Sequence, residues 1–251
     1  MQETIYVGLD LGSSHCCQSV IGADGSPRSS RLVRTSERQL RDAFAGLGGD
    51  VRVHMEAGEL ADWVGSVIGP LVSRVVVSHP RSLAWIGKDA TKDDRVDARK
   101  LAELLRLNRV HEVYRGQDAE RRTFRHLVTH HEQTSREQAR QKSKIKARLR
   151  TLGLIRKDAG LFTNAGQMAL LDAIEQPEIK RMITQLFAVL DRMIECEREA
   201  RAAMIEYSRR FPEVRRLQTA PGVGAITACR FVGYLQTPAR FSNKRKLWRY
   251  F

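Results

Sequence analysis

The segment at residues 4–14, TIYVGLDLGSS, constrains the fold of this 251-residue chain more than any other segment. Its apolar and β-branched residues predict a buried strand that ends at Asp10 and continues into a glycine-containing turn. An ionised carboxylate at the end of such a strand is costly to bury unless a positive charge lies against it. A divalent cation is the usual partner of such a carboxylate. We therefore expect Asp10 to belong to a metal-binding site.

The first hundred residues show an α/β pattern. After the strand that ends at Asp10, further strands are expected at residues 16–21, around 31–34, at 51–55 and at 74–77. A helix with apolar positions between residues 40 and 47 follows the third strand, with Thr35 or Ser36 as its N-cap, and another helix spans residues 60–68. This order predicts a mixed sheet with helices on its faces.

Further carboxylates fall at equivalent places in this pattern. Glu56 follows the strand at residues 51–55, so it lies beside Asp10 if the two strands are neighbours. The segment KDDRVDARKLAELLRL predicts an amphipathic helix, and Asp94 and Asp97 share one face of its first turn. Two acids at a helix N-terminus also complement the helix dipole, which is an explanation without a metal site.

The order of GLDLGSS, MEA and KDDRVDARKLA resembles the DEDD-type transposases of the bacterial insertion-sequence family one-ten, which includes the pilin gene invertases. The resemblance extends over essentially the whole chain. It implies an α/β RuvC-like, ribonuclease-H-type N-terminal domain with catalytic carboxylates that bind Mg²⁺. These carboxylates are Asp10, Glu56, Asp94 and Asp97. Asp93 is a reserve candidate for Asp94. Independently of the resemblance, a pair of divalent ions that catalyses phosphoryl displacement needs three or four carboxylates.

The same resemblance implies the partners of the protein. They are DNA, a structured guide known as the bridge RNA, and further copies of the chain in a homodimer or tetramer. It also implies a cytoplasmic, nucleoid-associated location in a bacterial cell. We expect an RNA-guided, magnesium-dependent DNA transposase or recombinase.

A rival interpretation begins at the same strand. GLDLGSS also resembles the first phosphate motif of the sugar kinase and actin ATPase superfamily, in which a glycine-rich turn holds nucleotide phosphates. That superfamily usually has a much longer chain and a second Asp-Gly phosphate turn, which stands in no suitable place in this sequence. A nucleotide-binding site also gives no reason for the formal net charge of +14.

The distribution of charge suggests a division of labour. Residues 1–110 carry 15 basic against 14 acidic side chains, residues 119–150 carry ten against three, and residues 151–251 carry 17 against ten. A basic surface binds polyanions through counterion release. We therefore expect the N-terminal part to hold the carboxylates and the C-terminal part to bind nucleic acid.

The middle of the chain predicts two long helices. One, at residues 117–154, is strongly basic, and the other, at residues 178–207, has the three-four apolar spacing of a coiled-coil seam. We expect them to form an antiparallel hairpin with the basic side chains outward. The expected phosphate contacts are Arg140, Lys142, Lys144, Lys146, Arg148 and Arg150. A solvated dimerisation helix is the alternative. His126, His130 and His131 are expected to be surface histidines.

The segment at residues 217–235, LQTAPGVGAITACRFVGYL, resembles the helix-hairpin-helix element of DNA-binding proteins. Gly222 and Gly224 would let the backbone approach a phosphate closely. A tight turn between two buried helices is the alternative. The tail RFSNKRKLWRYF adds Lys244, Arg245 and Lys246 beside aromatic side chains that suit nucleic-acid stacking.

The chain is thus expected to have three parts. Residues 1–110 form the RuvC-like domain, residues 111–208 the basic coiled-coil region, and residues 209–251 the start of a transposase C-terminal domain. In the resembling family, a serine beyond this point is the nucleophile that links to DNA, and Ser242 lacks its context. We expect a truncated form that binds nucleic acid and is deficient in covalent strand exchange. A non-catalytic nucleic-acid-binding truncation product is the alternative.

Cysteine spacing and hydropathy exclude other classes of protein. Cys16, Cys17, Cys196 and Cys229 show no metal-ligand spacing, so we expect reduced, core-type residues. The sequence contains no apolar run of transmembrane length, and no partner membrane is expected.

Overall fold

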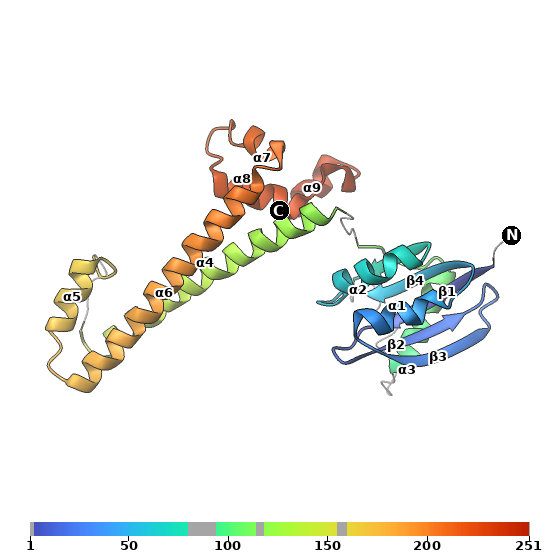
Figure 1. The fold of residues 1–251 in the computed structure, drawn as a ribbon. Coiled ribbons are helices and arrows are strands. Elements are labelled where there is room, and N and C mark those ends of the chain that lie inside the picture. The colour runs from blue at the N-terminus through green and yellow to red at the C-terminus, as the bar shows by residue number, and fades with distance from the viewer. Residues whose placement is uncertain (1–2, 80–93, 114–117, 155–159, 251) are drawn as a thin grey trace. The chain divides into compact units, whose positions relative to one another are not determined.

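The computed structural model describes residues 3–79, 94–113, 118–154 and 160–250. The chain divides into two compact units, Met1–Arg115 and Gly116–Phe251. Figure 1 shows the sheet in the first unit and the long helices in the second. None of the helices in these ranges combines the length and the apolar character that crossing a bilayer requires.

The N-terminal unit is built on a mixed five-stranded sheet with the order β3-β2-β1-β4-β5. Its strands are β1 (Thr4–Asp10), β2 (His15–Ile21), β3 (Pro27–Arg34), β4 (Asp50–Glu56) and β5 (Arg74–Ser78). The first three strands pair antiparallel as a meander, and β4 lies parallel to both β1 and β5. The mixed sheet predicted from the sequence is confirmed, and the central position of β1 makes it the neighbour of β4.

Strand β3 is longer than the sequence predicted. It begins at Pro27 rather than near Arg31, and all its residues except Val33 are exposed or polar. An edge strand with one exposed side needs no apolar alternation, because backbone pairing with β2 is enough to extend it. The segment PRSS has no apolar pattern, so the first half of the strand could not be predicted from it.

Helices cover both faces of the sheet. On one face, α1 (Glu37–Ala45) and α2 (Ala61–Ile68) form a core with the odd-numbered residues of β1 and β4. The largest buried members of this core include Leu9, Met55, Leu40, Phe44 and Ile68. On the other face, α3 (Asp94–Arg106) packs against β1, β2 and β4 through Ala98, Leu101, Ala102 and Leu105. Figure 1 shows α1 and α3 on opposite sides of the sheet.

The second unit contains two long helices, α4 (Ala119–Thr151) and α6 (Pro177–Ser208), which lie side by side (Figure 1). The beginning of α4 shares a core with the end of α6, through Phe124, Val128 and Met204. The end of α4 shares another with the beginning of α6, through Ile145, Ile183 and Phe187. The helices therefore run antiparallel, as the sequence predicted.

Short helices complete the second unit. α5 (Asn164–Asp172) lies between the long helices in sequence, and α7 (Pro212–Leu217), α8 (Ala225–Leu235) and α9 (Lys244–Tyr250) follow them. α8 lies so close to α4 that a Cβ on Gly233 would stand 2.7 Å from the Val128 side chain. The small residue at this contact is what allows the two helices to approach.

One prediction for α4 is wrong. His131 is not a surface histidine, because it is 1% exposed and its Nε2 lies 3.0 Å from Glu197 Oε1 on α6. No sequence pattern links these two residues, which stand 66 positions apart. His126 and His130 are exposed, as expected.

Candidate active site

The ends of β1 and β4 bring two carboxylates to one edge of the sheet. The parallel register pairs Leu9 with Met55, so the residues that follow, Asp10 and Glu56, stand at neighbouring strand ends. Side chains alternate between the two faces of a strand. Asp10 therefore shares its face with Gly8, and Glu56 shares its face with His54. This is the face that α3 covers.

Gly8 allows α3 to approach β1 at backbone distance. A Cβ at this position would stand 1.8 Å from the Ala98 carbonyl oxygen and 2.6 Å from the Ala102 nitrogen, so every larger residue forces the helix away. Ala98 directly follows Asp97, and Gly8 lies two residues before Asp10. The contact at Gly8 consequently places the acid-bearing first turn of α3 beside the end of β1.

The electrostatics of Asp10 show that the four carboxylates converge. Burial raises the pKa of Asp10 above its ordinary value, and repulsion from Asp94, Asp97 and Glu56 raises this pKa further. The Leu11 backbone N–H donates a hydrogen bond to Asp10 and works in the opposite direction. Charges from two other segments, α3 and β4, thus act on one carboxylate. All four predicted site residues are brought into electrostatic contact.

This donor set fits a divalent cation. Carboxylate oxygens are the ligands that Mg²⁺ prefers, and a cation among the four acids would reverse the repulsion that Asp10 experiences. Within the described ranges, no three His, Cys, Asp or Glu side chains already stand at coordination spacing. Coordination therefore requires side chains to turn inward, for which Glu56 and Asp94 are both exposed and free of core packing. Asp93, the reserve ligand, lies outside the described residues.

His54 is a residue of the site region that sequence reasoning missed. It is fully buried on β4, with Nδ1 2.7 Å from the Leu101 carbonyl oxygen on α3 and Nε2 2.8 Å from Ser78 Oγ on β5. Burial lowers its pKa, so the ring is neutral and its two nitrogens can serve one as donor and one as acceptor. His54 thereby links α3 to the sheet at Leu101, one helical turn after Asp97. Its position two residues before Glu56, on the same face, was the available signal.

The turn after Asp10 is held by Thr35. Its hydroxyl donates to the Gly12 carbonyl oxygen at 2.7 Å, and its backbone N–H donates to Ser14 at 2.9 Å. Ser36, rather than Thr35, caps α1 by accepting from the Gln39 N–H. Ser36 therefore caps the helix, and Thr35 holds the glycine-containing turn beside the site.

The predicted phosphate contacts on α4 divide into two groups. Arg140, Lys144, Arg148 and Arg150 are exposed. Lys142 and Lys146 are half-buried, and their ammonium groups lie 5.7 and 5.6 Å from the centre of the Phe162 ring. The first group is placed to meet a ligand from solution, whereas the second group also contacts the protein's own aromatic residue.

The second predicted binding segment forms a helix, a turn and a helix. α7 and α8 pack together, Gly222 has a φ of +81°, and Gly224 is the N-cap of α8. Both glycines are exposed. In the tail, Lys244, Arg245 and Lys246 are exposed on α9, and the Lys244 ammonium lies 5.8 Å from the centre of the Trp248 ring. These contacts do not test DNA binding, so the DNA-binding role of both segments stays a prediction.

Comparisons with known proteins agree with this geometry. Residues 7–153 match a family model described as a transposase, of the DEDD type named for IS110. Residues 214–251 match a model described as a transposase of the IS116/IS110/IS902 family. A search of curated proteins found no match. The first match covers more than half of the chain and includes all four carboxylates.

Proposed function

The chain belongs to the IS110 family of DEDD transposases, and from this premise we propose that its N-terminal unit performs magnesium-dependent phosphodiester chemistry on DNA. The observation that supports this most directly is the convergence of Asp94, Asp97 and Glu56 on Asp10. Bound Mg²⁺ would stabilise the charge on the attacking and leaving oxygens. The family membership favours this function over the sugar kinase or actin-like alternative.

The four residues of the proposed site come from two strands and one helix. Asp10 and Glu56 come from rigid, paired strands, and Asp94 and Asp97 come from the first turn of a helix packed on those strands. Asp10 is half-buried and is the common neighbour of the other three, so it would hold a bound cation together with them. Glu56 and Asp94 are exposed and would face the DNA.

The proposed binding surface lies on the second unit. The exposed bases on α4, the α7–α8 turn and the tail would bind phosphates, in keeping with ten basic against three acidic side chains in residues 119–150. We extend the proposal to a guide RNA and to a homodimer or tetramer as the working form, with a location at the bacterial nucleoid. These finer points rest on the family resemblance.

Metal titration of the full chain tests the proposed site. We expect Mg²⁺ to raise the melting temperature of the wild type and to leave that of Asp10→Ala unchanged. Asp62→Ala, at the start of α2, is the matched control because Asp62 is an exposed acid on the opposite face of the sheet. An equal response of wild type and Asp10→Ala would refute the four-carboxylate site.

A gel assay tests the expectation about strand exchange. Incubation of the chain with Mg²⁺, guide RNA and labelled DNA, followed by a denaturing gel, shows whether a protein-linked DNA band forms. A band that disappears in Ser242→Ala would identify Ser242 as the nucleophile. The alternative function, nucleic-acid binding without catalysis, predicts DNA binding that Asp10→Ala leaves intact together with no response to Mg²⁺.

A further inference from the structure

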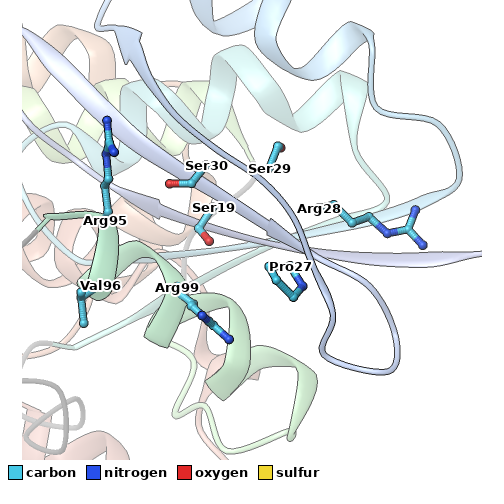
Figure 2. Close-up of a pocket in the computed structure, with 8 residues that line it drawn as sticks. All are labelled: Ser19, Pro27, Arg28, Ser29, Ser30, Arg95, Val96 and Arg99. Atoms are coloured by element: carbon cyan, nitrogen blue, oxygen red, sulfur yellow. The ribbon is translucent and has the colours of Figure 1, made fainter.

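A groove lined by arginine and serine side chains lies on the face of the sheet that α3 covers. It is a cavity of about 380 Å³ between α3 and the β2–β3 edge of the sheet. Its lining residues are Ser19, Pro27, Arg28, Ser29, Ser30, Arg95, Val96 and Arg99. Figure 2 shows the serines on the strands and Arg95 and Arg99 on the helix. No carboxylate is among the described residues that line it.

The groove is open because α3 covers only part of the sheet. The helix packs on β1, β2 and β4, while β3 is the edge strand beyond them. Gly8, Ser19 and Ser30 are cross-strand partners in one row, so the two serines continue the line on which α3 sits. Ser19 is 4% exposed and forms part of the floor, whereas Ser30 is exposed. Their small side chains leave the space that the groove occupies.

The periodicity of α3 separates its acids from its arginines. Successive residues turn by about 100° around a helix axis, and the buried residues Ala98, Leu101, Ala102 and Leu105 form one stripe. Asp94 and Asp97 fall at one margin of this stripe. Arg95 and Arg99 fall at the other margin. The same two turns of helix therefore offer carboxylates to the ends of β1 and β4 and guanidinium groups to the groove.

Guanidinium and hydroxyl groups together suit one class of ligand. Arginine binds phosphate through paired N–H donors, and serine hydroxyls add single hydrogen bonds to phosphate oxygens. Among the described residues that line the groove, none is an acid that would attract a cation. The groove lies on the same face of the sheet as Asp10, because Ser19 and Ser30 are in the cross-strand row of Gly8.

We propose that this groove binds a backbone phosphate of the DNA strand on which the carboxylates act. The inference deepens the proposed function and rests on it. Arg95 and Arg99 would hold the strand from the helix side, with Ser19 and Ser30 beneath it. The groove would thus set the register of the strand, and the carboxylates would act on the phosphate so positioned.

Site-directed cross-linking in the full chain tests this proposal. Cys196, the one cysteine that is not fully buried, is first replaced by serine. Ser30→Cys is then incubated with single-stranded DNA that carries a bromoacetamide on one backbone phosphate, so that the cysteine sulfur displaces bromide and forms a thioether. We expect cross-linking at Ser30→Cys to exceed that at Ser66→Cys at least about five-fold, a modest ratio for a phosphate held in place. Ser66 is an exposed serine on α2, on the opposite face of the sheet.

A charge variant shows whether the groove itself holds the strand. Arg99→Gln should lower the cross-linking yield of Ser30→Cys several-fold, and Arg41→Gln, on α1, should leave it unchanged. Equal yields at Ser30→Cys and Ser66→Cys, or no effect of Arg99→Gln, would overturn the proposal. The same oligonucleotide made of RNA provides a further arm, in which cross-linking to RNA but not to DNA overturns the assignment to DNA.

The metal titration separates this proposal from the one on which it rests. If Asp10→Ala abolishes the response to Mg²⁺ but cross-linking fails, the groove proposal is rejected and the metal site is retained. Cross-linking that succeeds without any wild-type response to Mg²⁺ rejects the proposed chemistry and shows that the groove binds a strand for another purpose.

Discussion

The ionised form of Asp10 is destabilised by burial and by the neighbouring acids. Its carboxylate is half-buried and is repelled by three other acids, so its pKa lies above the ordinary value of 3.8. A raised pKa of an acid means that folding disfavours the ionised form. At neutral pH, the metal-free protein is therefore less stable than it would be with a neutral side chain at this position. Functional sites commonly hold such unfavourable groups.

We predict that Asp10→Asn raises the melting temperature of the metal-free protein at neutral pH by a few degrees. Above the folded-state pKa, the wild type carries the full penalty of the ionised Asp10, and below the unfolded value of 3.8 the penalty is absent. The difference between the two proteins should therefore shrink on acidification. Calorimetry in the presence of a chelator measures it. A less stable Asn variant would show that Asp10 gains more from local hydrogen bonds than it loses by repulsion.

His54 makes the stability of the fold depend on pH in the opposite direction. Burial lowers its pKa below the ordinary value of 6.5, so the folded state keeps the ring neutral while the unfolded state takes up a proton. Above that value both states are neutral, and below it stability falls with pH by up to about 1.4 kcal/mol per pH unit for one proton.

We expect urea unfolding to show this loss between about pH 7 and about pH 5.5 in the wild type. The loss should be smaller in His54→Gln, which cannot take up the proton. His126→Gln is the control, because His126 is exposed on α4. Equal pH dependence of the His54 variant and the wild type would contradict the neutral, buried histidine.

At the scale of elements, the position of α3 decides the geometry of the site. The helix is placed by the missing side chain of Gly8 and by the hydrogen bond between His54 and the Leu101 carbonyl oxygen. Because α3 carries two of the four acids and two arginines of the groove, a small movement of this helix changes both sites together.

Gly8→Ala should move α3 and weaken the site at a distance. The added methyl would meet backbone atoms, which cannot swing aside, so we expect a loss of at least about 1–3 kcal/mol in the free energy of unfolding. We also expect a smaller thermal response to Mg²⁺. Gly46→Ala is the matched control, since a Cβ at Gly46 has nothing within 4 Å. Urea unfolding and metal titration provide the two measurements, and an unchanged metal response would show that α3 does not set the site.

At the scale of the whole molecule, charge and chemistry are carried by different units. Residues 1–110 are nearly neutral, whereas residues 119–150 and 151–251 are each strongly basic. A nearly neutral unit can hold a cluster of acids while the basic unit provides most of the attraction to nucleic acid. DNA affinity and metal affinity should therefore respond to different substitutions.

The double variant Arg140→Gln/Lys144→Gln should bind duplex DNA more weakly than the wild type, with a shallower dependence on salt. Each lost phosphate contact lowers the slope of log K against log salt by about 0.9. Arg38→Gln/Arg41→Gln removes the same charge from α1 and should change the slope little. Binding titrations at several salt concentrations make the comparison, and equal slopes for the two variants would refute the division between the units.

The sequence by itself indicated most of the elements and the candidate acids. The apolar strands, the caps and the amphipathic pattern of α3 are local properties, so the end of β1 at Asp10 and the start of α3 at Asp94 could be predicted from neighbouring residues alone. The antiparallel pairing of α4 and α6 was also expected, from the three-four apolar spacing of residues 178–207.

Only the tertiary structure decided which distant residues meet. The pairing of β1 with β4, the approach of α3 over Gly8, the double contact of His54 and the burial of His131 against Glu197 all join positions far apart in the chain. The arginine groove likewise exists because β3 extends past the helix that covers its neighbours. Such contacts depend on packing between elements, and the apolar periodicity of one element does not show which element it packs against.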